Sequence, residues 1–200
     1  MVLLSGHRRV VFAGDGNLAV RDGFVGCLDA WVRLYGPEGV EFVPAALPGS
    51  LLKDYLRRFE RDVFPLKPDL LVVVPGTTDI LFSGDGETGR IVEAAEELLD
   101  ELCGLTGKDG LVFTSTLLFS DDPGFFQNDL AREFNGRLSE ACGRRGVEYW
   151  DLFTPLMEAL ERLHPTRLTV DGMTLSPLGH LLLFAETARR LGVKLDRDRE

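Results

Sequence analysis

The sequence predicts an α/β protein, in which a five-stranded, mostly parallel sheet lies between two layers of helices. Five short apolar runs alternate with longer segments whose apolar residues recur every three or four positions. Such alternation is typical of strand–helix units, whose parallel strands are buried on both faces. The length of 200 residues and the 44% hydrophobic content suit one domain with a sizeable core. We therefore expect a doubly wound, flavodoxin-like three-layer α/β/α sandwich.

The five expected strands are apolar and rich in β-branched or aromatic residues, which favours extended structure. They are Arg9–Ala13, Val40–Val43, Leu70–Val74, Gly110–Thr114 and Val147–Trp150. The segments with helical periodicity are Leu18–Leu34, Leu51–Val63, Arg90–Cys103, Phe126–Cys142 and Pro177–Leu191. The third of these helices carries an apolar stripe opposite an acidic face, and Gly104 is its expected end because glycine enters the left-handed conformation without strain.

Composition bounds the location and the partners of the protein. We expect one domain over residues 1–194 and a disordered, highly charged tail over 195–200. The net charge of −10 argues against nucleic acid and against anionic membranes as partners. Cys27, Cys103 and Cys142 are odd in number, so we expect core residues in a reducing compartment. Without an export signal or an apolar run of about 18 residues, a soluble cytoplasmic protein is expected.

Four short motifs lie at the ends of the expected elements. They are Gly14-Asp15-Gly16-Asn17, Pro48-Gly49-Ser50, Gly76-Thr77-Thr78-Asp79 and Asp171-Gly172-Met173-Thr174. In this order they resemble the four blocks of the SGNH, or GDSL-type, hydrolase family of esterases and lipases. Residues 134–138 and 146–152 also resemble the penultimate helix and strand of that family. The resemblance covers nearly the whole chain and implies the SGNH-hydrolase fold.

Three positions depart from the family pattern. Gly16 stands where the resemblance implies the nucleophilic serine, Thr78 where it implies the oxyanion-hole asparagine, and Thr174 where it implies the catalytic histidine. Gly49 and Asp171 match the family glycine and the family aspartate. Because acyl transfer needs a nucleophile and a base positioned beside it, we expect no catalytic residue in this chain.

Ligand binding does not need these three side chains, because an oxyanion pocket is built largely from backbone donors. The N–H groups of Gly16 and Gly49 remain, and Thr78 adds a hydroxyl; Asp15 and Asp171 complete the expected pocket. We therefore predict a catalytically impaired protein that binds a small acyl, carboxylate or sugar ligand, without a cofactor. The expected partner is a small molecule with a carbonyl or carboxylate group.

The same residues leave two other functions open. The protein is an ester hydrolase of unusual mechanism if Asp15 or Asp171 activates a water in the space above Gly16, which requires a raised carboxyl pKa. It is a scaffold for an unidentified protein partner if the pocket is vestigial.

Other interpretations of the same residues are less favoured. Asp15, Asp79 and Asp171 offer oxygen ligands for a divalent metal, but hydrogen bonds to turns explain them better, and we expect no metal. Residues 14–19 also match the G-x-G-x-x-A turn of dinucleotide-binding proteins, although the Asp15 carboxylate opposes a pyrophosphate there. His180 lies near Asp171 in the sequence, and we interpret it as a packed structural residue.

Overall fold

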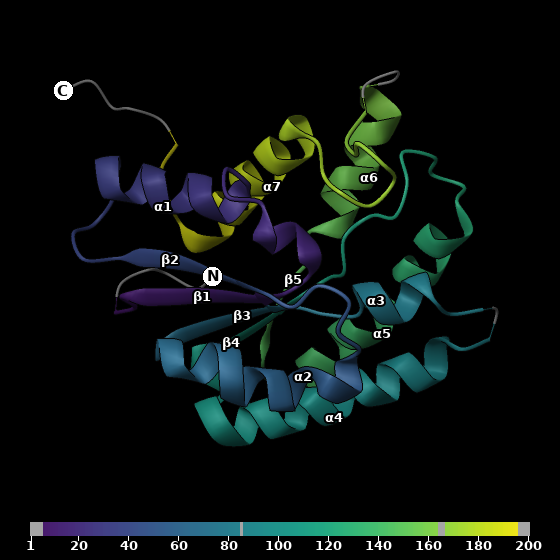
Figure 1. Ribbon diagram of the computed structural model, residues 1–200, viewed down its shortest axis with the longest axis horizontal. Helices are drawn as coiled ribbons and strands as arrows, with labels where there is room; N and C mark the ends of the chain where they lie inside the picture. The colour runs from purple at the N-terminus through teal and green to yellow at the C-terminus, as the bar shows by residue number, and fades with distance from the viewer. Residues whose placement is uncertain (1–5, 85, 164–166, 196–200) are drawn as a thin grey trace.

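The computed structural model describes residues 6–84, 86–163 and 167–195. Its sheet has the strand order β2-β1-β3-β4-β5, and each neighbouring pair is parallel (Figure 1). The strands are β1 (Arg9–Gly14), β2 (Glu41–Ala46), β3 (Leu70–Val74), β4 (Leu111–Thr114) and β5 (Glu148–Trp150). The five-stranded, mostly parallel sheet predicted from the sequence is confirmed, and every pair is parallel.

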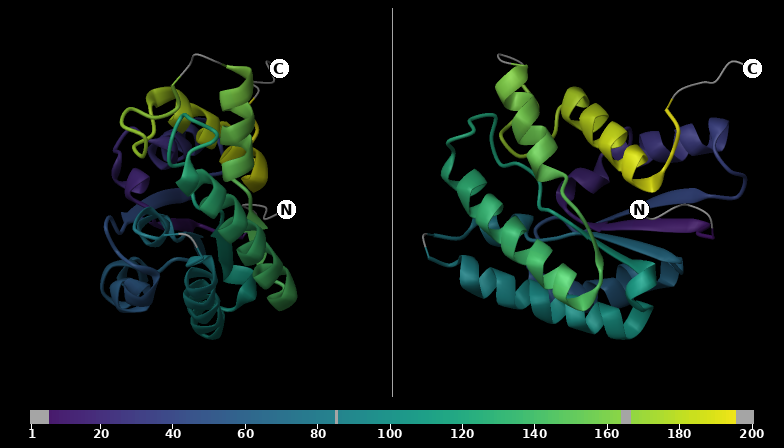
Figure 2. Two further views of the ribbon diagram at one scale, coloured as in Figure 1. Left: turned by 90° about the vertical axis from the view of Figure 1, so that its right-hand side faces the viewer. Right: turned by 180° about the vertical axis from the view of Figure 1, so that it is seen from behind.

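Helices cover both faces of the sheet (Figures 1 and 2). One layer contains α1 (Phe24–Tyr35), α6 (Phe153–Arg162) and α7 (Pro177–Leu191); the other contains α2 (Leu52–Arg58), α4 (Thr88–Thr106) and α5 (Phe126–Arg145). The short helix α3 (Thr77–Leu81) lies at the carboxyl end of β3. The predicted three-layer α/β/α sandwich is therefore the observed fold.

The central strands β1 and β3 lie in the middle of a continuous apolar core. Every residue of β3 and every residue of β1 after Arg9 is buried. This double-sided burial explains why both strands read as unbroken apolar runs instead of alternating ones. Among the described residues no helix is both long and apolar enough to cross a bilayer.

Several expected boundaries were wrong. β2 continues through Pro44 to Ala46, which an edge strand tolerates because it pairs on one side only. Gly104 lies inside α4, and the helix ends where Gly107 takes a positive φ of 72°. Cys27 is exposed on α1, whereas Cys142 is buried as expected and Cys103 is half-buried.

Other differences concern elements that the sequence prediction merged or missed. The segment expected as one helix from Leu18 begins with a 3₁₀ turn (Gly16–Ala19) that is separate from α1. The segment 51–63 contains α2 followed by a π-helical turn, Phe59–Val63, and a 3₁₀ turn, Phe64–Leu66, follows beyond its expected end. A further 3₁₀ turn, Lys108–Gly110, precedes β4. The helices α3 and α6 were not predicted, and the part of the expected tail from residue 196 onward lies outside the described residues.

Candidate ligand site at the carboxyl ends of β1, β2 and β3

The turn after β1 requires glycine at its first position. Gly14 has a φ of +126°, and a Cβ atom there would lie 2.1 Å from the backbone oxygen of Val74 in β3. The next residue, Asp15, donates its backbone N–H to the same oxygen at 3.1 Å. The close approach of β1 and β3 thus fixes where the chain leaves the sheet.

The Asp15 carboxylate holds two motifs together inside the protein. The side chain is 3% exposed, and its Oδ1 accepts hydrogen bonds from the backbone N and the Nδ2 of Asn17 at 2.6 and 2.9 Å. Its Oδ2 accepts a hydrogen bond from the Thr77 hydroxyl, whose oxygen lies 3.1 Å from that of Thr116. Oδ1 therefore closes the turn after β1, and Oδ2 joins that turn to the start of α3.

Gly16 is exposed at the beginning of the 3₁₀ turn. A Cβ atom at this position would meet only the Cβ of Pro48, at an ordinary contact distance of 3.7 Å. The second motif therefore lies against the first. Gly49 follows Pro48 with a φ of +71° in a turn closed by the hydrogen bond from Ser50 N to Leu47 O at 3.1 Å.

The third motif connects α3 to the start of α2. Asp79 Oδ2 accepts a hydrogen bond from Leu52 N at 3.0 Å. Burial raises the pKa of Asp79, and the bond from Leu52 opposes that rise. The hydroxyl of half-buried Thr78 makes no hydrogen bond with another described residue. It is therefore available to a ligand.

The fourth motif is an exposed loop that Asp171 closes on itself. Oδ1 of Asp171 accepts hydrogen bonds from the backbone N–H groups of Thr174 and Met173 at 2.6 and 2.9 Å, and Oδ2 accepts one from the Thr174 hydroxyl at 2.9 Å. The Thr174 N–H, followed by the Met173 N–H, lowers the pKa of Asp171. Asp171 is thus a turn-forming carboxylate and a weak base.

Asn17 attaches this loop to the rest of the site, and the sequence analysis missed its role. Its Nδ2 donates to Met173 O at 3.0 Å, and its Oδ1 accepts from Leu175 N at 2.7 Å. These bonds bring Thr174 to the same region as Gly16, although more than 150 residues separate them. The sequence signal for this role was the asparagine itself, two residues after Asp15, because asparagine side chains often form hydrogen bonds with backbone groups in turns.

His180 belongs to a different environment. It is 5% exposed, its ring stacks on Phe24 with 6.3 Å between centroids, and its Nδ1 accepts a hydrogen bond from Phe24 N at 3.3 Å. Burial lowers its pKa. It is a packed residue against α1, as interpreted from the sequence.

A comparison with known protein families shows the family to which this chain belongs. The sequence pattern of the GDSL-like lipase/acylhydrolase family matches residues 13–182, a range that includes all four motifs. The chain belongs to this family. No curated protein sequence matches it significantly.

Several solved structures with the same fold are acetylxylan esterases. Axe2 from Geobacillus stearothermophilus is 19% identical, with a TM-score of 0.81 over 96% of this chain and 97% of that one. A catalytic mutant of Axe2 gives a TM-score of 0.82 over 100% and 99% of the two chains. A second acetylxylan esterase, AlAXEase, is 15% identical, with a TM-score of 0.81 over 92% and 99%.

In this GDSL-like chain, the residues that form the turns of the site are distinct from the residues at the three replaced positions. Gly14, Asp15 and Asp79 form the turns and their hydrogen bonds. Gly16, Thr78 and Thr174 occupy the positions where the family resemblance implies reactive side chains. The four motifs thus converge on one region with neither a serine nor a histidine at those three positions.

Proposed function

We propose that this chain is a catalytically impaired GDSL-like protein that binds a small acyl, carboxylate or sugar ligand at the carboxyl ends of β1, β2 and β3. The observation that carries the proposal is Gly16, which is exposed, unobstructed and without a side chain to acylate. The candidate carboxylates support it as well. Those of Asp15 and Asp171 already accept hydrogen bonds on both oxygens.

The donors needed for binding are free. Among the described residues, the backbone N–H groups of Gly16 and Gly49 have no backbone acceptor, and the Thr78 hydroxyl has no partner. Three such donors on neighbouring turns favour a carbonyl or carboxylate oxygen, which accepts more than one hydrogen bond. The similar solved structures are esterases of acetylated xylan, so acetylated sugars are the first ligands to test.

An active esterase of unusual mechanism is less well supported. A water placed above Gly16 needs a general base, and efficient bases have pKa values near the working pH. The pKa of Asp171 is lowered from its ordinary value.

We also infer a reducing, cytoplasmic location, supported by three free cysteines.

The test is hydrolysis of p-nitrophenyl acetate and of acetylated xylo-oligosaccharides. It compares the wild type, Gly16→Ala and the triple variant Gly16→Ser, Thr78→Asn, Thr174→His. We expect turnover from the triple variant alone, because the Cβ of a serine at position 16 would contact Pro48 without a steric clash. Other hydrolases that lose their triad still accelerate hydrolysis about 10³–10⁴-fold over the uncatalysed reaction in water. We expect the residual activity of the wild type to be no higher than that.

Controls separate a trace of activity from a working mechanism. Wild-type turnover at rates of about 1 s⁻¹ or higher, lost in Asp171→Asn, would overturn the proposal and establish Asp171 as a base. Binding of acetate or an acetylated sugar to the wild type, measured by calorimetry, tests the ligand-binding part separately. Absence of both binding and turnover would leave only the scaffold function.

A further inference from the structure

A cavity of about 340 Å³ lies beside the third motif, between the starts of α2 and α4 and the end of α3. Its lining includes Leu51, Lys53, Asp79, Phe82, Ser83 and Arg90. Leu51 lies two residues after Gly49, and Asp79 directly follows Thr78, so two of the lining residues are close in the chain to donors of the candidate site. Its volume is within the range of small-molecule sites, about 300–1,000 Å³.

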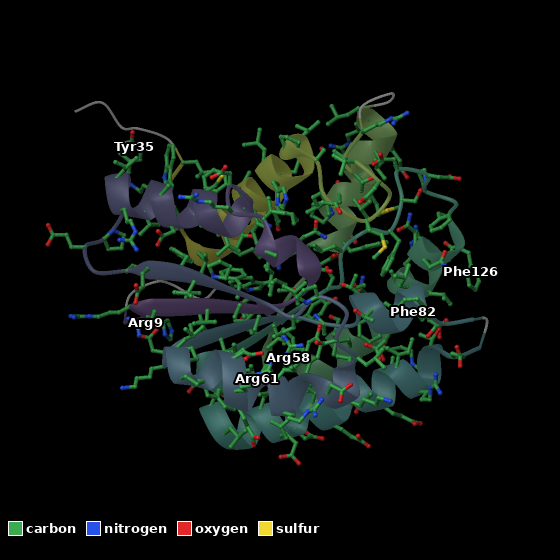
Figure 3. The ribbon with its side chains drawn as sticks, in the orientation of Figure 1. Arg9, Tyr35, Arg58, Arg61, Phe82 and Phe126 are labelled. Carbon is green, nitrogen blue, oxygen red and sulfur yellow. The ribbon has the colours of Figure 1, made fainter. Side chains whose placement is uncertain are left out.

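The wall of this cavity contains an unusually exposed aromatic residue. Phe82 is 78% exposed and lies at the end of α3 (Figure 3), although most phenylalanines of this chain are buried. The rest of the lining combines apolar side chains, among them Ile91 and Ala94, with polar ones. A flat apolar ring in such a wall is suited to stacking against the apolar face of another ring. A ligand that covers the exposed ring removes apolar surface from water, which favours binding.

The charged residues that line the cavity, Lys53, Arg90 and Asp79, carry one net positive charge, and Glu87 outside the lining pairs with Arg90. Arg90 Nη2 lies 3.1 Å from Glu87 Oε1, while Lys53 and Asp79 contribute one charge of each sign. Among the described residues no carboxylate forms an ion pair with Lys53, and no other residue donates to Asp79 Oδ1. One free cationic donor beside one free acceptor fits neighbouring hydroxyl groups better than it fits a net anion.

From these features we propose that the cavity is a subsite for a neutral sugar ring, stacked on Phe82 and hydrogen-bonded to Lys53 and Asp79. One part of this inference rests on the proposed function, namely that an acyl group on the bound ring is held by the donors of Gly16 and Gly49. Binding of the unacylated sugar depends on the cavity alone.

The experiment is calorimetric titration of the full chain with xylotriose, acetylated xylotriose and galacturonate. Phe82→Ala and Lys53→Met are the test variants, and Phe126→Ala and Arg57→Met are the matched controls. Phe126 and Arg57 are also exposed and lie outside the cavity lining. We expect Phe82→Ala to weaken xylotriose binding about tenfold, typical of truncating an aromatic anchor, and the controls to leave it unchanged.

The outcomes distinguish the two proposals. Xylotriose binding that depends on Phe82, without any gain from acetylation, supports the subsite and counts against an acyl group at Gly16. Acetate binding that is unaffected by Phe82→Ala, with no xylotriose binding, supports the proposed function and overturns the subsite. Tighter binding of galacturonate than of xylotriose would overturn the preference for a neutral ring. Phe82 is exposed, so its truncation leaves the fold intact for all three measurements.

Discussion

Replacing Asn17 with alanine should release the loop of residues 171–175 from the turn after β1. The change removes the hydrogen bonds to Met173 O and from Leu175 N, together with the bond from Asn17 Nδ2 to the Asp15 carboxylate. The bond between the backbone N of residue 17 and Asp15 remains. The perturbation is therefore confined to the contacts that join the first and fourth motifs.

The magnitude follows from the burial of these groups. Leaving the buried Leu175 N–H without an acceptor costs about 1–3 kcal/mol, and each of the other two bonds contributes about 1 kcal/mol. The free energy of unfolding should fall by about 3–5 kcal/mol in total. For a chain of 200 residues this corresponds to a decrease in Tm of about 6–20 °C.

Urea denaturation measures the free energy, and hydrogen exchange at Leu175 locates the change. Gln127→Ala is the control, because that amide makes no hydrogen bond with another described residue. We expect rapid exchange at Leu175 in Asn17→Ala and wild-type exchange in the control. A destabilisation below about 0.5 kcal/mol, the usual range of surface substitutions, would refute the assigned role of Asn17.

Three further predictions concern single positions. Gly14→Ala should prevent folding or cost more than about 4 kcal/mol because of its positive φ and its contact with β3, whereas Gly16→Ala should cost less than about 1 kcal/mol; similar denaturation midpoints for the two variants would contradict this. The lowered pKa of Asp171 means that its stabilising effect is present above the unfolded pKa of about 4 and is lost as the pH falls through the lower folded value. Wild type and Asp171→Asn should therefore converge in urea midpoint on acidification from pH 7, and a constant gap would count against the assigned cause. Burial lowers the pKa of His180 in the folded protein, so the folded state favours the neutral imidazole. Its contribution to stability is present above the unfolded pKa of about 6.5 and is lost as the pH falls through the lower pKa of the folded state. His180→Gln should flatten the stability profile below pH 6.5, and an unchanged slope in urea titrations would disprove the contribution.

Local patterns predicted the elements that are either fully apolar or strongly periodic. β1 and β3 are continuous apolar runs, which explains why they were located within one residue of their observed bounds. α6 was missed even though Phe153, Leu156, Met157 and Leu160 follow a helical period and are buried. The five-residue α3 has too few turns for a periodic signal, and its position depends on the bond between Asp79 and Leu52.

The sequence by itself determined the three-layer fold, the order of the four motifs and the identity of the side chains at positions 16, 78 and 174. These are local properties, because strand and helix patterns and residue types can be read without knowing distances. The tertiary structure alone decided that Asn17 holds the loop of Asp171, and that a cavity opens beside Phe82. Contacts of this kind join segments far apart in the chain, so their geometry exists only after the sheet has aligned the strand ends and the helices have packed against it.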